Sequence, residues 1–267
     1  RKATVDLRYD REGLNHDRVF RMFGLTLPDA LDGEALLSAL LSQLRKGREG
    51  PLVITYHAAT ETLERLFPGA VYLHICRDPR DVAASVTRLG WAGNTYFGVD
   101  PWLEAETDWD RFKAHAAKER YCEISYEALV LDPKSELSRV CAFLGLDFAE
   151  AMLGYAKKST YDAPDPSLVT RWPKTLSPRE VALIERKCGD LLEDRGYTRA
   201  HPKRPPPGAL LEMVLKADNK IRKVLAAISF FGFTDYALEK VYRLPGLKDR
   251  HLTVKRRMDE TVNKSLK

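Results

Sequence analysis

The stretch "HICRDPRDVAAS", residues 74–85, joins the end of an apolar run to the start of a helix. The run "AVYLHIC" (70–76) predicts a buried strand, so Arg77 lies at the carboxyl end of that strand. Asp78 is a favourable helix cap, and Pro79 suits the first helical position. We therefore predict a strand, a tight turn that carries an arginine, and a helix over residues 79–89.

Two further apolar runs place this unit in a sheet. "PLVITYHA" (51–58) predicts a strand, and the helix expected through "TETLERLF" would lead from it to the strand at 70–76. A strand, a helix and a strand in this order form a parallel pair with a right-handed crossover. "RYCEISY" (120–126) predicts a third strand. The sequence thus predicts an α/β domain with a central parallel sheet between layers of helices.

The rest of the chain divides by composition and helix signals. We predict a main domain over 1–200, a rigid proline-rich linker at 201–208 ("HPKRPPPG") and a basic helical extension over 209–267 with a break at 244–246. Within the main domain we expect loops at 90–110 and 155–176. Further helices are expected at 32–47 with Asp32 as cap, at 110–119, at 133–145 with Asp132 as cap, and at 177–197.

The composition of the 267 residues is that of a globular protein, at 44% hydrophobic and 30% charged. No run reaches the ~20 apolar residues that a membrane-spanning helix needs. The four cysteines are scattered without metal-ligand spacing, so we expect buried free thiols, no metal site and a cytoplasmic location. Residues 199–267 hold 16 Lys/Arg against 7 Asp/Glu, so the basic character belongs to the extension and does not indicate nucleic-acid binding by the main domain.

The turn at Arg77 has the elements of an anion site. Ligands bind at the carboxyl ends of the strands in open α/β sheets. A helix N-terminus offers unpaired N–H groups, Arg77 offers a bidentate guanidinium and Ser85 offers a hydroxyl. These groups indicate a phosphate clamp. The alternative is a capped helix in which Arg77 only pairs with Asp81.

Three blocks in order strengthen the first interpretation. They are "FPGAVYLHICRDPRDVAAS", "ISYEALVLDPKSELSRVCAFLGLDF" and "TRWPKTLSPREVALIERKCGDLLEDRGY". Together they resemble the PAPS-dependent sulfotransferase family, and the resemblance spans about residues 51–197. It implies a three-layer, P-loop NTPase-like fold. It also implies transfer of a sulfuryl group from 3′-phosphoadenosine 5′-phosphosulfate (PAPS) to a hydroxyl or amine, with release of 3′-phosphoadenosine 5′-phosphate (PAP) and without a metal.

The resemblance assigns roles to particular residues. Arg77 and Ser85 match the pair that binds the 3′-phosphate, and Tyr126 of "SYEAL" matches the tyrosine near the adenine. The loop "TRWPK" resembles the one that closes over the 3′-phosphate, which makes Arg171 and Lys174 cofactor-binding candidates.

The resemblance also suggests a catalytic base. Cytosolic relatives carry a histidine in a strand that reads like "I-K-T-H", and "I-T-Y-H" here places His57 on it. Thr55 replaces the lysine that would assist the leaving group. Some relatives use a carboxylate instead, for which Glu61 is the candidate. His74, in the middle of its strand, is interpreted as a core residue.

The sequence departs from the family in lacking the glycine-rich "P-K/R-S-G-T-T" loop that cradles the 5′-phosphosulfate. We expect this loop to lie upstream of Arg1. The alternative is a catalytically inactive relative that binds a nucleotide or a protein partner. A kinase-like phosphotransferase is disfavoured because it needs a Walker loop and acidic magnesium ligands, whereas Asp78 and Asp81 are better used as helix cap and first-turn acid.

The sequence leaves three classes of acceptor: a small molecule, a carbohydrate or a lipid. Aromatic residues in 90–110 could line its pocket, namely Trp91, Tyr96, Phe97, Trp102 and Trp109. The basic extension could lie on an anionic membrane, contact a second subunit or pack back on the main domain.

Overall fold

The computed structural model describes residues 26, 33–47, 49–56, 60–158, 163–244 and 246–265. Its contacts divide the chain into two units, residues 1–70 and residues 71–267, each considered separately. The first unit contains helices α3 (Gly33–Arg45) and α4 (Thr60–Leu66). Asp32, the expected cap of α3, lies outside the described residues.

The strand expected at 51–58 is not formed in its described part. Residues 51–56 have no regular structure, and Val53 is 74% exposed. An apolar, β-branched run becomes a strand only where a neighbouring strand pairs with it and its side chains are covered. Neither condition is met at 51–56 in the described chain, so this prediction was wrong.

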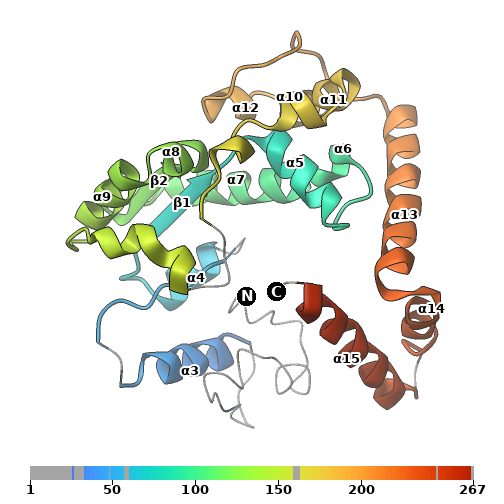
Figure 1. Cartoon of the computed structure of the whole chain (residues 1–267), viewed down its shortest axis with the longest axis horizontal. Helices are drawn as coiled ribbons and strands as arrows, with labels where there is room; N and C mark the ends of the chain where they lie inside the picture. Colours follow the sequence, from blue (N-terminus) through green and yellow to red (C-terminus); the bar gives the residue numbers. More distant parts are fainter. Residues whose placement is uncertain are drawn as a thin grey trace. The chain divides into compact units, whose positions relative to one another are not determined.

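The second unit holds a two-stranded parallel sheet (Figure 1). Strands β1 (Tyr72–Cys76) and β2 (Tyr121–Ser125) pair from Tyr72 opposite Tyr121 to Cys76 opposite Ser125. Both strands lie where the sequence predicts them. The described chain is mostly helical around this small sheet, and the larger central sheet stays a prediction.

Helices pack against both faces of the sheet. On one face Leu73 joins Cys122 and Ile124, and α9 (Pro133–Phe143) covers them through Val140. On the other side of β1, Cys76 packs against a core formed by α5 (Pro79–Arg88), α7 (Asp100–Lys113), α11 (Pro178–Cys188) and α12 (Leu191–Asp194). This core fixes α5 at the end of β1.

The expected loop at 90–110 is instead helical. It contains α6 (Thr95–Gly98) and most of α7. Trp102, Glu106 and Trp109 recur at helical spacing and are buried. The prediction was wrong because a buried glutamate interrupts the apolar pattern. The aromatic residues Trp102 and Trp109 therefore belong to the core.

The helix expected at 110–119 is not formed over that range, because α7 ends at Lys113, and the helix expected at 177–197 is divided into α11 and α12 at Gly189. The start of α9 and of α11 follows the prediction. Asp132 caps α9 through Ser135 N, and Ser177 forms a capping box with Glu180 at the start of α11. The helices of the extension are interrupted at Gly232, where no break was predicted, and between Val241 and Lys248, where one was predicted. The other elements are α8 (Tyr126–Leu131), α10 (Trp172–Thr175), α13 (Ala209–Phe231), α14 (Phe233–Val241), α15 (Lys248–Ser265), and the short 3-10 helices η1 (Lys118–Arg120), η2 (Glu150–Lys158) and η3 (Pro166–Leu168).

Among the described residues, no helix has both the length and the apolar character needed to span a membrane.

Candidate functional site

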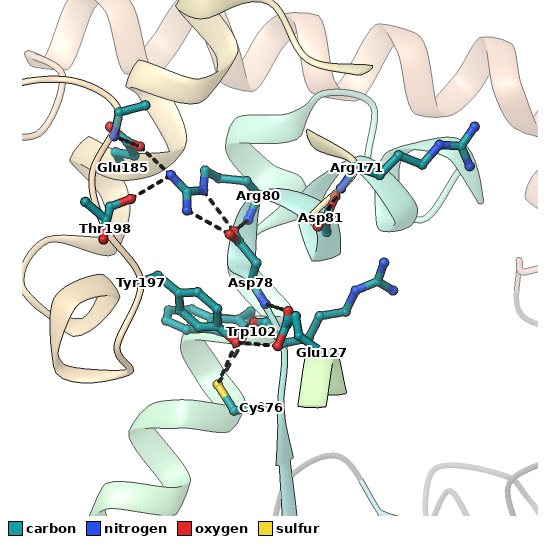
Figure 2. A network of polar contacts seen from close by, with 12 residues as sticks. Cys76, Asp78, Arg80, Asp81, Trp102, Glu127, Arg171, Glu185, Tyr197 and Thr198 are labelled. Atoms are coloured by element: carbon teal, nitrogen blue, oxygen red, sulfur yellow. Dashed lines mark hydrogen bonds and ion pairs between the residues drawn. The ribbon is translucent and has the colours of Figure 1, made fainter. Parts of the chain in front are cut away.

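The peptide that joins β1 to α5 is held on both sides. Trp102 Nε1 donates to the Arg77 carbonyl at 2.9 Å, and Asp78 N donates to Glu127 Oε1 at 2.9 Å. Glu127 Oε2 also accepts from Ser125 Oγ, and it accepts from Tyr197 OH, as Figure 2 shows. Trp102 and Glu127 therefore fix the backbone at the strand end, and Ser125 and Tyr197 hold the Glu127 carboxylate in place.

The Arg77 side chain extends from this fixed peptide. Its guanidinium lies over the Tyr126 ring, 4.3 Å from the ring centre, and Nη2 donates to the Leu168 carbonyl at 3.2 Å. Nε is buried and has no hydrogen-bond partner among the described residues. A buried guanidinium N–H without an acceptor is costly, so this atom points to an anionic ligand.

The N-terminus of α5 differs from the expected anion site because acidic side chains occupy it. Asp78 and Asp81 are both buried there, and Asp78 Oδ1 accepts from Arg80 N at 2.9 Å. The first-turn N–H of Arg80 is therefore already bonded. An anion at this strand end would be bound by the Arg77 side chain rather than by the amides of α5.

Arg80 links the strand end to α11. Its guanidinium donates to both carboxylate oxygens of Asp78, at 2.9 and 2.7 Å, and to Glu185 Oε1 at 2.8 Å. Nη1 also donates to the Thr198 carbonyl at 3.0 Å (Figure 2). The same guanidinium lies 3.9 Å from the centre of the Trp172 ring. Arg80 thus connects α5 with α11, the turn after α12, and the loop that carries Arg171 and Lys174.

Asp81 makes a second link to that loop. Its Oδ2 accepts from the Arg171 backbone N at 3.2 Å. Burial, with the charge of Asp78, raises the pKa of the Asp81 carboxyl, although Arg77 and the N–H groups of Arg171 and Trp172 act in the opposite direction. Figure 2 shows the Arg171 side chain pointing away from Arg80. The Arg171 backbone is therefore anchored while its guanidinium remains available.

The structure brings some predicted site residues together and not others. Arg77 and Tyr126 are in contact, and Arg171 is joined to α5 through its backbone. Ser85 lies on α5 one turn after Asp81, on the same helix face, and Lys174 lies on α10 with its side chain exposed. His57 lies outside the described residues, and Glu61 begins α4 in the other unit. The catalytic base therefore stays a prediction.

One cluster near the site has metal-ligand chemistry. Ligand atoms of His74, Cys76 and Glu106 lie within 4.8 Å of one another. However, Glu106 Oε2 lies 3.0 Å from His74 Nε2 and also accepts from Arg195. Burial and the Glu106 charge raise the pKa of the Cys76 thiol to about 12, which disfavours the thiolate that a metal needs. An arginine on the carboxylate and a protonated thiol favour an ion-pair cluster over a metal centre.

A cavity of about 390 Å³ lies away from Arg77, beside the end of α11. Three of its four cations already have partners, since Lys203 pairs with Asp190, Lys187 with Asp100, and Arg186 with the Pro205 carbonyl. We attribute this cavity to the packing of the proline-rich linker. It is lined by Arg186, Lys187, Gly189, Asp190, Lys203, Arg204, Pro205 and Pro206.

A family model described as "Sulfotransferase family" matches residues 7–150, just over half of the chain, including Arg77, Ser85 and Tyr126. The chain belongs to the sulfotransferase family. The resemblance to sulfotransferases is thereby confirmed, and the first two of the three sequence blocks lie within the matched residues.

Two curated relatives match this sulfotransferase at 26% identity over 161 residues. Both are named omega-hydroxy-beta-dihydromenaquinone-9 sulfotransferase Stf3, one from Mycobacterium bovis (strain ATCC BAA-935 / AF2122/97) and one from Mycobacterium tuberculosis (strain CDC 1551 / Oshkosh). The match covers 55% of this chain and 41% of each relative. The sulfotransferase chain thus spans less than half the length of these relatives.

Two solved sulfotransferase domains are similar to this chain. The sulfotransferase domain of the Synechococcus PCC 7002 olefin synthase superposes with a TM-score of 0.54 at 24% identity, covering 72% of this chain and 78% of that domain. A sulfotransferase domain from the curacin biosynthetic pathway matches with a TM-score of 0.45 at 22% identity, over 63% and 69% of the two chains. The first of these likenesses supports a sulfotransferase fold for this chain.

The sequence analysis missed Glu127, Arg80 and Glu185 as parts of the site. A signal for Glu185 was present, because it is a carboxylate on the apolar face of α11 beside Ile184 and Cys188. A charge at such a position is retained only with a buried partner. That partner is Arg80, which lies 105 positions earlier in the chain, so the sequence around Glu185 does not indicate it.

Proposed function

We propose that this chain binds PAPS and transfers its sulfuryl group to a hydroxyl or amine, releasing PAP. The observation that carries the proposal is the geometry of the Arg77 side chain at the end of β1. Its guanidinium lies over the Tyr126 ring, and its buried Nε has no hydrogen-bond partner among the described residues. Family membership supports sulfuryl transfer as the chemistry.

The 3′-phosphate of the co-substrate is the anion proposed for Arg77. Binding would replace the 3.2 Å contact to the Leu168 carbonyl and supply the acceptor that Nε lacks. A guanidinium is suited to two phosphate oxygens at once. We propose that Ser85, on the next turns of α5, and the Arg171 and Lys174 side chains add further donors to the same phosphate.

Tyr126 has a double role in this proposal. Its ring already orients the Arg77 guanidinium through a cation–π contact. Its position at the first residue of α8, directly after β2, also places an aromatic edge at the carboxyl end of the sheet. We propose that the adenine of the co-substrate lies against it.

The transfer step requires a base for the acceptor. The acceptor oxygen or nitrogen attacks sulfur, the bond from sulfur to the phosphate oxygen breaks, and PAP leaves with that oxygen. The proton of the acceptor passes to a base, for which we propose His57, with Glu61 as the carboxylate alternative. Arg77 would hold PAP in place while charge builds up on the leaving phosphate.

A lipid alcohol is a reasonable acceptor class. The two curated relatives are named for a hydroxylated dihydromenaquinone. We therefore propose a lipid or another small molecule with a hydroxyl group as acceptor, ahead of a carbohydrate. A non-catalytic, nucleotide-binding relative is the second candidate.

Calorimetric titration with PAP and with AMP, which lacks the 3′-phosphate, tests the proposal. The wild type should bind PAP more tightly than AMP, and Arg77→Ala should remove most of this preference while AMP binding changes little. Loss of a charge-assisted, bidentate contact corresponds to a factor of about 10 to 100 in affinity. Arg88→Ala, an exposed arginine at the end of the same helix, is the matched control.

Equal loss of PAP and AMP affinity in Arg77→Ala would show that Arg77 does not read the 3′-phosphate. If the wild type binds neither ligand, the second candidate is also weakened, because both candidates require a nucleotide at this strand end.

A further inference from the structure

Helix α13 has one face that docks on the rest of its unit. Asn94 Nδ2 donates to the Leu215 carbonyl at 2.9 Å and to Asp218 Oδ2 at 2.8 Å, and Gly93 N donates to Asn219 Oδ1 at 2.7 Å. A Cβ on Gly93 would lie 2.2 Å from the Asn219 carbonyl oxygen, so the two backbones touch. The inner face of α13 is defined by these contacts. Figure 1 shows this long helix beside α6.

Another face of α13 carries exposed apolar side chains. Leu210 is 77% exposed, Ile221 59% and Leu225 60%. Helical geometry places these residues on one stripe, turned away from the positions that contact Gly93 and Asn94. We call this set the outer stripe; it consists of Leu210, Met213, Val214, Ile221 and Leu225.

Three lysines run along one edge of the outer stripe. Lys216, Lys220 and Lys223 are exposed, and the structure gives them no ion pair within the described residues. We call them the lysine row. Arg222, in contrast, pairs with Asp218. The row therefore presents uncompensated positive charge beside apolar surface.

The two acidic residues of α13 leave its exposed side basic. Asp218 bonds to Asn94 on the docked side. Glu212 is exposed and lies one helical turn before Lys216, and its charge contributes, after burial, to the raised pKa of the Tyr96 phenol. The exposed side thus carries the lysine row against one glutamate. The extension as a whole continues this bias, with 16 Lys/Arg against 7 Asp/Glu in residues 199–267.

This combination distinguishes a lipid surface from a protein partner. Lysine is depleted in the cores of protein interfaces. At a membrane, in contrast, the lysine stem lies along apolar surface while the ammonium reaches the headgroup phosphates. A helix with one apolar face and a basic polar face lies in the plane of the membrane interface.

We propose that α13 binds the surface of a membrane that contains anionic lipids. The outer stripe enters the headgroup region, and the lysine row contacts the lipid phosphates. The main domain is then held through Gly93 and Asn94 on the opposite side of the helix. This inference does not depend on the identity of the nucleotide or the acceptor.

Co-sedimentation of the full chain with vesicles tests the proposal. The probes are vesicles of phosphatidylcholine alone and vesicles with about one third phosphatidylglycerol. The chain should bind only the second kind, and added salt should weaken the binding. Ile221→Asp/Leu225→Asp should abolish it. Lys220→Glu/Lys223→Glu should lower the partition coefficient at least about 25-fold, since each lysine near an anionic surface contributes about fivefold.

The matched control is Arg111→Glu/Lys118→Glu, which removes the same charge from exposed positions on and after α7. It should bind almost as well as the wild type. Circular dichroism and sedimentation velocity of each variant establish that it is folded and report its oligomeric state.

Three results would overturn the proposal. The first is a wild-type chain that ignores anionic vesicles and is monomeric. The second is a dimer that Ile221→Asp/Leu225→Asp dissociates, because a second copy would then cover the outer stripe. The third is equal loss of binding in the control pair, because binding would then follow net charge and not α13.

Discussion

Replacement of Arg80 by methionine should destabilise the sulfotransferase unit strongly. Methionine keeps much of the side-chain volume but removes the charge. Asp78 would lose two guanidinium contacts, at 2.9 and 2.7 Å, and Glu185 would lose one at 2.8 Å. The side chains of Arg80, Asp78 and Glu185 are all at most 5% exposed, so water cannot replace these contacts.

The magnitude follows from the burial of the two carboxylates. Breaking a buried ion pair by removing one partner costs about 3–5 kcal/mol, because the remaining charge is left without compensation. For a chain of this size each kcal/mol lowers the midpoint of thermal unfolding by about 2–4 °C. Arg80→Met should therefore lower that midpoint by roughly 6–20 °C.

A matched control isolates the effect of burial. Lys134→Met is the control, because its partner Glu150 and Lys134 itself are both more than 60% exposed, and it should leave the midpoint unchanged.

Denaturant and thermal unfolding, followed by near-ultraviolet circular dichroism, measure these quantities. A loss below about 1 kcal/mol would refute the reasoning that Arg80 compensates two buried carboxylates.

Two other substitutions test the buried ion pair of Glu106 and the docking of α13 on Gly93. Burial alone would raise the pKa of the Glu106 carboxyl, but His74 and Arg195 outweigh it and lower that pKa. Stability from this carboxyl is therefore present above its unfolded pKa of about 4.3 and is lost as the pH falls through the lower, folded value. Glu106→Gln should lower the free energy of unfolding by about 3 kcal/mol at pH 7, and this loss relative to the wild type should shrink below about pH 4. A loss that stays constant from about pH 7 to about pH 3 would argue against the ion pair. Gly93→Ala should push α13 away, since the new Cβ would lie 2.2 Å from the Asn219 carbonyl oxygen. Limited proteolysis should then cleave within 209–231 much faster than in the wild type, whereas Gly154→Ala, which meets nothing within 4 Å, should not change the pattern; equal protection of both variants would mean that α13 does not dock through Gly93.

The parts of the structure that the sequence predicts are those with local signals. The starts of α5, α9 and α11 were predicted because Asp78, Asp132 and Ser177 each bond a backbone N–H two or three residues away. The strands β1 and β2 are short apolar runs that pair with each other. Local chemistry is sufficient in these cases.

The parts that were missed depend on distant partners. Glu106 obscured helix α7 in the sequence, because its partners His74 and Arg195 lie 32 and 89 positions away. The run at 51–56 is richer in β-branched residues than β1 but forms no strand pairing in the described chain. The family resemblance assigned Arg77 and Tyr126 to one nucleotide site, but neither it nor any periodicity in the sequence predicted their contact.

The central claim is that Arg77 binds the 3′-phosphate of a phosphoadenosine nucleotide. A crystal structure of the chain with PAP tests it most directly. We expect the 3′-phosphate within hydrogen-bond distance of Arg77 Nε, the Leu168 carbonyl released from Nη2, and the adenine against Tyr126. A structure in which Arg77 keeps its contact to Leu168, while the phosphate lies in the cavity between Arg186 and Lys203, would contradict the account.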